Sequence, residues 1–507
     1  MAVPIDIFFL DHDGEGTLQA RIQQMVAEAI LSGRLRRGEK LPSTRRLAAH
    51  LGVSRITVTL AYTELVANDF LTSRGRSGYF VSPNAPEPPV FSESRTQADT
   101  MNWPRVIARR FSGGGTPRKP VDWRAYAYPF TYGQPDERLF DYNSWRLCAM
   151  KALGRREQAP VIRDWYDRDD PDLVDFVARH ILPRRGITAG PAEILITLGA
   201  QNALWLAAQV LLDPTRRAAF EEPGYYSLRD ILAQSGCRMA PVAVDRNGMQ
   251  PDLVPDGTDV IFTTPSHQFP TSATMPLARR KALLRRASRL NAVIVEDDYE
   301  FEMSFLRPAS PALKSLDREG RVLYVGSFSK SLFPGLRLGY LVGSPAVLGE
   351  ARALRSAVLR HPPGLTQRIT AHYLSLGYYD AMISRMKRAF EHRRQVMDQA
   401  ISDHGLTIAG RGVYGGSSFW MRAPDGVDMG QVGDALARQE VLIEPGAPFF
   451  ARSDPPLNFY RLAYSSIPAD RIATGIARIA AAINAAGVGE PGSPLDRKAR
   501  GGGGGFP

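Results

Sequence analysis

A lysine followed seven residues later by an arginine is the clearest chemical signal in the chain. Lys330 comes after the apolar run Val322–Ser327, beside the hydroxyl residues Ser327 and Ser329, and Arg337 follows a Pro-Gly turn. A lysine amine can capture an aldehyde as an imine, and serine hydroxyls with an arginine fork are suitable donors to a phosphate. The segment therefore suits covalent binding of a phosphorylated aldehyde. For any single lysine, a surface position at a strand end is the more common interpretation.

Polar and aromatic residues that could complete such a site follow other apolar runs. Ala200 and Gln201 open a helix after a strand and a glycine, where backbone amides can hold a phosphate. Tyr225 follows another strand and could stack on a flat heterocycle. Asp297 ends a third apolar run, where it could hold a proton on a pyridine nitrogen while Tyr299 donates to a phenolic ring oxygen. Taken singly, these residues also fit an ordinary glycine turn, a packed core tyrosine and helix-capping acids.

Alternating strands and helices between residues 194 and 342 would position these residues. This order predicts an α/β fold with a mostly parallel central sheet covered on both faces. In such sheets ligands bind beyond the carboxyl ends of the strands, where the residues named above fall. The predicted strands are Ile194–Thr197, Ala218–Glu221, Met239–Val244, Val260–Thr264, Val293–Glu296, Val322–Ser327 and Leu338–Val342, and two of the helices are Ala203–Leu212 and Pro276–Leu290.

The first 82 residues have the pattern of a separate, smaller domain. Apolar residues recur at helical spacing in three segments, and Ser43 and Ser54 stand where the N-caps of the second and third helices are expected. Two short strands around a glycine-containing turn complete residues 71–81. Three helices followed by a hairpin predict a winged helix-turn-helix. The predicted helices are Thr17–Ser32, Thr44–Leu51 and Arg55–Asn68.

Basic residues gather in this domain. Between Arg34 and Arg76 there are nine lysines and arginines but three acidic residues, and the whole chain carries a formal charge of +11. Such a cluster favours contact with phosphates. Ser54, Arg55 and Thr57 begin the third helix and could reach base edges in the major groove of DNA. The alternative is a small helical domain with a solvated basic face.

Length and composition limit the remaining possibilities. A chain of 507 residues, 44% of them hydrophobic, can hold more than one domain and a sizeable core. Its two cysteines, Cys148 and Cys237, argue against a disulfide framework and for a reducing compartment. No apolar run approaches the ~20 residues of a membrane span, and residues 7–10 lack the preceding basic residues of a secretory signal. We therefore expect a cytoplasmic protein with no membrane partner and no metal site.

Two segments have little periodicity. Residues 83–125 are rich in proline and glycine and predict an extended linker, with a short helix over Met101–Phe111. Residues 487–507 include five consecutive glycines and predict a disordered tail. The expected domains are therefore residues 1–82, which would bind DNA, and residues 126–486, which contain the predicted sheet.

The run Leu35–Tyr62 (LRRGEKLPSTRRLAAHLGVSRITVTLAY) closely resembles the GntR-type winged-helix domain. The match extends over nearly the whole segment. The resemblance implies that the first domain binds double-stranded DNA. The DNA-contacting positions that it implies are Ser43, Arg45, Ser54, Arg55, Thr57, Arg76 and Gly78.

From about residue 126 to residue 484 the chain resembles the fold type I aminotransferases that depend on pyridoxal 5'-phosphate, because five motifs occur in that family's order. On this resemblance Lys330 forms the internal aldimine and Asp297 pairs with the pyridine nitrogen. Tyr299 would serve the ring oxygen, and Tyr225 would stack on the ring. The phosphate-binding residues that the resemblance implies are Ala200, Gln201, Ser327, Ser329 and Arg337.

Arg461 lies in a Tyr-Arg-Leu-Ala-Tyr-Ser-Ser run and matches the arginine that receives a substrate carboxylate in that family. A GntR-type head joined by a long linker to an aminotransferase-like body is the architecture of the MocR/GabR family of bacterial regulators. The motifs at residues 133–136 and 264–270 also resemble motifs of that family. Membership implies a head-to-tail homodimer on an operator with repeated half-sites. It also implies control of a catabolic or transport operon by a small amine or amino acid, sensed through an external aldimine.

Several residues depart from the aminotransferase pattern. Residues 269–272 read Phe-Pro-Thr-Ser instead of Asn-Pro-Thr-Gly, and the usual Gly and Leu-Arg are missing after Tyr166; both argue against efficient transamination. Ser227 replaces the second arginine of GABA-sensing members, and residues 300–305 loosely resemble the subgroup linked to ectoine and taurine catabolism. Two alternatives stay open: an aminotransferase with an accessory DNA-binding head, and a repressor that has lost its cofactor.

Overall fold

The chain divides into two compact units, Met1–Arg110 and Phe111–Pro507. The computed structural model describes residues 3–10, 16–86, 101–108, 111, 120–131, 133, 135–157, 161–164 and 168–488. Predictions outside the described residues concern the tail beyond residue 488, linker residues 87–100, 109–110 and 112–119, Gln134 and Tyr166. Within the predicted linker, helix α4 (Trp103–Val106) is shorter than expected. Across the described part of the chain, no helix combines the length and apolarity needed to cross a membrane.

Three α-helices and a hairpin make up the segment between residues 16 and 86 of the first unit, as the sequence predicts. Its elements are α1 (Leu18–Leu31), α2 (Thr44–Leu51), α3 (Arg55–Ala67) and the antiparallel strands β1 (Leu71–Ser73) and β2 (Tyr79–Val81). The Ser43 and Ser54 side chains cap α2 and α3 by accepting hydrogen bonds from the N–H groups of Arg46 and Thr57, at 3.3 and 3.1 Å. The turn between these helices contains Gly52 at a φ of 66°, a left-handed conformation that favours glycine.

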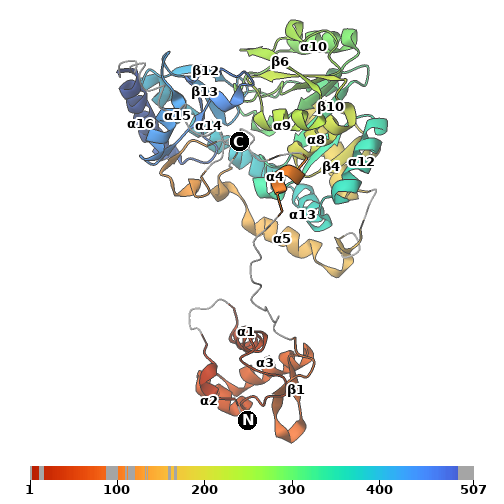
Figure 1. The fold of residues 1–507 in the computed structure, drawn as a ribbon, viewed down its shortest axis with the longest axis vertical. Helices are drawn as coiled ribbons and strands as arrows, with labels where there is room; N and C mark the ends of the chain where they lie inside the picture. Colours follow the sequence, from red (N-terminus) through yellow and green to blue (C-terminus); the bar gives the residue numbers. More distant parts are fainter. Residues whose placement is uncertain are drawn as a thin grey trace. The chain divides into compact units, whose positions relative to one another are not determined.

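A large sheet forms the centre of the second unit (Figure 1). Its eight strands are β4 (Ile194–Thr197), β5 (Arg217–Glu222), β6 (Arg238–Asp245), β7 (Gly248–Met249), β8 (Val260–Thr263), β9 (Val293–Asp297), β10 (Val322–Ser327) and β11 (Gly339–Val342). Their spatial order is β4-β11-β10-β9-β8-β5-β6-β7. The strands from β10 to β6 run parallel, whereas β11 is antiparallel to both neighbours and β7 is antiparallel to β6. The predicted mostly parallel sheet is confirmed.

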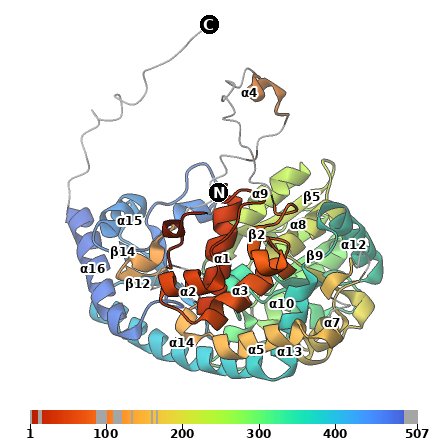
Figure 2. The ribbon, with the colours of Figure 1, turned by 90° about the horizontal axis from the view of Figure 1, so that it is seen from below.

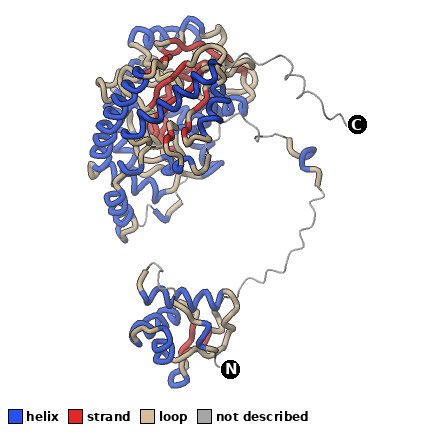
Figure 3. Tube along the Cα trace, turned by 90° about the vertical axis from the view of Figure 1, so that its left-hand side faces the viewer, coloured by secondary structure: helices blue, strands red, loops and turns tan. Residues whose placement is uncertain are grey.

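Helices cover both faces of this sheet (Figures 1 and 3). The described α-helices of this unit as far as residue 403 are α5 (Tyr142–Ala152), α7 (Pro171–Phe176), α8 (Ala200–Leu211), α9 (Tyr226–Ser235), α10 (Leu277–Leu290), α11 (Leu313–Leu316), α12 (Pro345–Leu359), α13 (Gly364–Ser375) and α14 (Tyr378–Asp403). On one face, α8, α9 and α12 bury strand residues such as Phe262 and Val295. On the other, α10 packs on Ile261 and Ile294, because successive strand residues point to opposite faces.

A four-stranded antiparallel sheet follows α14 and is absent from the predicted elements. Its strands, in spatial order, are β12 (Thr407–Arg411), β13 (Ser418–Arg422), β16 (Phe459–Ala463) and β15 (Glu444–Pro445). The same segment contains α15 (Met429–Ala437), α16 (Ala469–Val488) and β14 (Val441–Leu442), which pairs with β3 (Tyr128–Pro129). Figures 1 and 2 show this C-terminal segment, drawn in blue, at the opposite end of the unit from α12.

Candidate functional site

The predicted lysine lies at the carboxyl edge of the large sheet. Asp297 is the last residue of β9, Ser327 is the last of β10, and Val325 of β10 pairs with Asp297. Beyond β10, the Ser329 N–H donates a hydrogen bond to Ser327 Oγ at 3.1 Å. Lys330 Nζ reaches the glycine at position 133 so closely that an added Cβ there would lie 2.3 Å from this nitrogen. The structure therefore gathers these separate sequence segments at one edge.

The three acids that close β9 differ in their partners. Glu296 accepts hydrogen bonds from two backbone N–H groups at the start of α11, at 2.8 and 2.9 Å. Asp298 Oδ2 accepts from Arg185 Nε at 2.6 Å and from the Tyr324 hydroxyl at 2.9 Å. Asp297 is buried between them, and its Oδ1 has no hydrogen-bond partner among the described residues. Glu296 and Asp298 thus hold neighbouring parts of the fold, although Asp298 Oδ1, like Asp297 Oδ1, has no hydrogen-bond partner among the described residues.

Burial changes the protonation of Asp297. It raises the pKa of this carboxyl to about 8, helped by repulsion from Asp298 and Glu221 and opposed by the charge of Lys330. Asp297 and Glu221 line one small cavity, in which Glu221 accepts a hydrogen bond from the Thr263 hydroxyl at 2.7 Å. Asp297 can therefore hold a proton at neutral pH and share it with a buried nitrogen.

The start of α8 and an arginine form a corner suited to an anion. Gly199, the N-cap, has a φ of 83° and no side chain to satisfy the first amides of the helix, which belong to Ala200 and Gln201. Arg337 Nη2 donates to a carbonyl of this turn at 3.0 Å. A Cβ added to Gly199 would lie 3.3 Å from Arg337 Nη2, so the missing side chain keeps this approach open. The first amides of α8 and the Arg337 guanidinium thus lie around one turn, where an anion could bind.

Phe269 lies at the centre of an aromatic cluster beside the predicted ring-binding tyrosines. Its ring centroid is 5.3 Å from that of Tyr225 and 6.1 Å from that of Tyr299. Burial raises the pKa of the Tyr225 phenol, so this group stays protonated at neutral pH. The residue that replaces the aminotransferase asparagine thus gives the site an apolar wall where that family has an amide.

Arg461 adjoins this cluster and already holds a carboxylate. Its side chain is 2% exposed, and its guanidinium carbon lies 4.2 Å from the centroid of the Phe269 ring. Arg461 Nε donates to Glu444 Oε2 at 2.9 Å. The sequence motif predicts the arginine but gives no sign of Glu444, because an acid in a short polar-apolar run carries no periodic signal.

Glu300 is a second carboxylate that the sequence analysis misses. It is buried, and it accepts a hydrogen bond from the Ser417 hydroxyl. Burial raises its pKa to about 7, and this shift is opposed by that hydrogen bond and by the charges of Lys330 and Arg461. Its position three residues after Asp297 is the one sequence signal that could have identified it.

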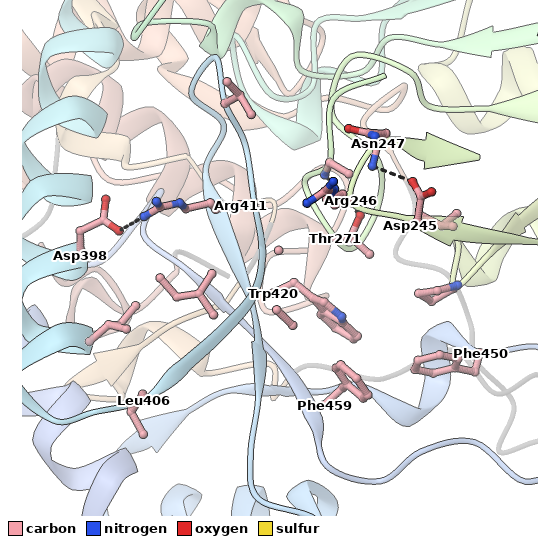
Figure 4. Close-up of a pocket in the computed structure, with 18 of the residues that line it drawn as sticks. Asp245, Arg246, Asn247, Thr271, Asp398, Leu406, Arg411, Trp420, Phe450 and Phe459 are labelled. Atoms are coloured by element: carbon pink, nitrogen blue, oxygen red, sulfur yellow. Dashed lines mark hydrogen bonds and ion pairs between the residues drawn. The ribbon is translucent and has the colours of Figure 1, made fainter. Parts of the chain in front are cut away.

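A larger cleft, of about 1010 Å³, borders the aromatic cluster (Figure 4). Trp420 lines it and stacks on Phe459 with ring centroids 5.5 Å apart. The cleft also carries the ion pair between Arg411 and Asp398, at 3.3 Å. The residues predicted to bind cofactor and effector are not among those that line this cleft.

The first unit presents most of its predicted DNA-contacting residues to solvent. Those that are exposed are Ser43, Arg45, Ser54 and Arg55, and those that are half-buried are Thr57 and Gly78. The side chain of Arg76 lies outside the described residues. Ile56 is 72% exposed on the same turn of α3 and is not among the predicted contacts. The sequence signal that could have identified it is its apolar side chain at a position outside the helical spacing of the buried residues of α3.

Comparison with known proteins accounts for both parts of the chain. Residues 18–81 match the family model of bacterial regulatory proteins of the gntR family, and residues 143–479 match that of aminotransferase class I and II. The HTH-type transcriptional regulator TauR of Rhodobacter capsulatus is 56% identical over 483 residues, which cover 95% of this chain and 100% of that protein. The probable rhizopine catabolism regulatory protein MocR of Rhizobium meliloti is 31% identical over 389 residues, 76% of this chain and 78% of that protein. The chain belongs to the MocR family.

As a MocR-family protein, the chain is a transcription regulator with a GntR-type head and an aminotransferase-like body. The alpha-aminoadipate aminotransferase LysN of Thermus thermophilus, solved with N-(5'-phosphopyridoxyl)-L-leucine, is 27% identical with a TM-score of 0.68, over 76% of this chain and 99% of that one. The kynurenine aminotransferase of Pyrococcus horikoshii, 24% identical with a TM-score of 0.69, covers 76% of this chain and 98% of its own and shares the fold. The predicted fold type I architecture is confirmed.

Proposed function

We propose that this MocR-family regulator binds pyridoxal 5'-phosphate at Lys330, senses a small amine or amino acid and thereby controls a catabolic or transport operon. The observation that carries the proposal is Asp297 Oδ1, a buried oxygen without a hydrogen-bond partner among the described residues. Buried polar atoms rarely stay unsatisfied, and a pyridine nitrogen would supply the missing partner. The adjacent lysine and the anion-binding corner match the cofactor's aldehyde and phosphate.

Different residues of the chain would bind different parts of the cofactor. Asp297 would hold a proton between Oδ1 and the pyridine nitrogen, Tyr299 would donate to the ring oxygen, and Tyr225 would stack on the ring. When bound, pyridoxal phosphate supplies an aldehyde carbon that a primary amine can attack reversibly, and Lys330 would provide that amine in the resting state. The phosphate would be held by Ala200, Gln201, Ser327, Ser329 and Arg337.

The effector would meet the site through its amine and its acid group. Its amine would take the place of Lys330, and Arg461 would bind the acid group with its planar fork. Lys330, once released as a free amine, would take up a proton and carry its positive charge near Glu300 and Asp297, whose pKa values that charge lowers. Effector binding therefore redistributes charge at the carboxyl edge of the sheet.

The head would read DNA through α3 and the wing. The exposed Arg45 and Arg55 stand at the beginnings of α2 and α3, where phosphates and base edges are within reach of a helix-turn-helix. We propose contacts from all seven predicted residues: Ser43, Arg45, Ser54, Arg55, Thr57, Arg76 and Gly78. A head-to-tail homodimer in the cytoplasm would place two heads on repeated half-sites of an operator.

A regulator of this kind works only if the effector prefers one body conformation. A tenfold preference corresponds to about 1.4 kcal/mol and changes operator occupancy tenfold at most. The linkage is reciprocal, so operator DNA must change the affinity for the amine by the same factor.

Operator binding measured with and without amines tests the proposal. We expect at least one primary amine to change the operator affinity of the wild-type protein and to leave that of Lys330→Ala unchanged, although the variant still binds DNA. An amine effect that persists in Lys330→Ala would contradict covalent sensing. Sustained keto-acid production from an amino donor would favour the aminotransferase alternative, and a colourless protein with amine-insensitive DNA binding would favour the cofactor-free repressor.

A further inference from the structure

Arg461 and Glu444 form an ion pair across two neighbouring strands of the C-terminal sheet. Glu444 of β15 pairs in register with Arg461 of β16, which places both side chains on the same face. The contact joins Arg461 Nε to Glu444 Oε2 at 2.9 Å, and the two side chains are 2% and 15% exposed. The positive charge that would attract an effector's acid group is thus already compensated by the protein.

Aromatic rings fix the guanidinium in place. Its central carbon lies 4.2 Å from the centroid of Phe269 and 4.8 Å from that of Phe449. Phe269 in turn borders Tyr225 and Tyr299, so the ion pair adjoins the place where the proposed cofactor ring would stack. Since Arg461 is held from two sides, the anion bound to it can change more readily than the arginine can move.

Glu444 must oppose any second anion at this arginine. An acid group from the effector either shares the guanidinium with Glu444 or replaces it. In the first case two negative charges lie close together in a poorly solvated place, and in the second the established ion pair is broken. Buried Glu300, whose pKa of about 7 is held down in part by the charge of Arg461, is a further carboxyl group near the site.

We propose that Glu444 is a specificity-determining residue that competes with the acid group of the effector for Arg461, and this proposal rests on the proposed function above. It occupies the arginine when no effector is present, and an acid-bearing amine binds by replacing it. Glu444 therefore lowers the affinity of the site for weakly bound amino acids, while amines without an acid group leave the ion pair intact. A residue that merely positioned Arg461 would have the opposite effect on acid-bearing amines when substituted.

Paired titrations of the cofactor-loaded, full-length protein separate these roles. The probes are β-alanine and β-alaninamide, which have the same amine and differ in having an acid or a neutral amide. Binding is read from the shift of the cofactor absorbance band. We expect Glu444→Gln to bind β-alanine about tenfold more tightly than the wild type does, and to bind β-alaninamide within twofold of the wild-type affinity.

Two further variants serve as controls. Glu444→Asp keeps the charge and should hold the ratio of the two affinities within threefold of the wild-type value, whereas Arg461→Gln should abolish any preference for the acid. Unchanged or weaker β-alanine binding by Glu444→Gln, with a band shift still present, would overturn the competitor role and leave the proposed function standing. If no primary amine shifts the band of the wild type or the variants, the proposed function fails, and the competitor role fails with it.

Discussion

The body of the chain fully buries several of its arginines, whereas the described arginines of the head are exposed or half-buried. In the body, Arg185 and Arg355 are fully buried, and each lies 2.6 Å from a carboxylate, that of Asp298 and that of Asp169. In the head, arginines such as Arg55 are exposed at the beginnings of helices. A buried arginine bound to an internal carboxylate orders the fold, whereas an exposed one can neutralise an external polyanion. The net charge of +11 therefore says less about DNA binding than the location of each charge does.

The largest expected effect is the loss of stability when one buried arginine is removed. Arg185 also donates to Ser266 Oγ at 2.9 Å, and its loss would strand the Asp298 carboxylate in the interior. We expect Arg185→Met to lower the free energy of unfolding by about 3–5 kcal/mol. Arg55→Met in the head should change it by no more than about 0.5 kcal/mol. Urea denaturation of both variants measures the difference, and equal losses would refute the distinction.

Removing an exposed arginine should instead weaken DNA binding. We expect Arg55→Ala to cost about 1–3 kcal/mol of operator affinity and, if the side chain contacts a phosphate, to reduce the salt slope by about 1. Cofactor absorbance and thermal stability should stay as in the wild type. Fluorescence anisotropy of labelled operator DNA at several salt concentrations measures both quantities. Wild-type affinity in the variant would show that α3 is not the recognition helix.

The buried acid Asp297 should make the free energy of unfolding of the body depend on pH. Its pKa is raised to about 8 in the folded chain, against roughly 3.9 in an unfolded one. Between these values unfolding releases a proton, so the free energy of unfolding of the cofactor-free protein falls as pH rises, by up to about 1.4 kcal/mol per pH unit from this group. In Asp297→Asn that contribution should vanish. Denaturation of both proteins from pH 5 to 8 tests this, and parallel curves would place the titration elsewhere.

The smallest effects should distinguish two nearby residues of the head, Ser54 and Ile56. Ser54 caps α3 by accepting the N–H of Thr57 at 3.1 Å, so Ser54→Ala should destabilise the head by about 1 kcal/mol. Ile56 is largely exposed and lies outside the hydrophobic core of the head, so Ile56→Ala should leave stability within about 0.5 kcal/mol. Its apolar side chain could contact a thymine methyl group, and its loss should then lower operator affinity. Thermal unfolding of the isolated variants, followed by operator titration, compares them.

Residues on the carboxyl edge of the large sheet could be predicted from the sequence for a physical reason. Asp297 ends a largely buried strand, and Lys330 and Tyr225 each come three residues after one, so the strand ends mark the edge where ligands bind. Two strands, β4 and β10, match their predicted bounds, and the others differ by one or two residues at their ends.

The acid-binding end of the site could not be predicted in the same way. Glu444 lies on β15, which is two residues long, and its contact with Arg461 depends on the register of a sheet that no periodic pattern reveals. Glu300 lies in a turn after β9, where the sequence shows only one more acid in an acidic run. In both cases the pairing of a carboxylate is a long-range property of the fold.

The central claim is that Lys330 captures a carbonyl cofactor in the body of a DNA-binding regulator. It is tested most directly by titrating purified wild-type protein, Arg55→Ala and Lys330→Ala with pyridoxal 5'-phosphate and recording their absorbance spectra. We predict that the wild type and Arg55→Ala develop the same imine band, removed by borohydride reduction, and that Lys330→Ala does not. A wild-type protein that remains colourless at saturating cofactor, or a Lys330→Ala protein with the same band, would contradict the account.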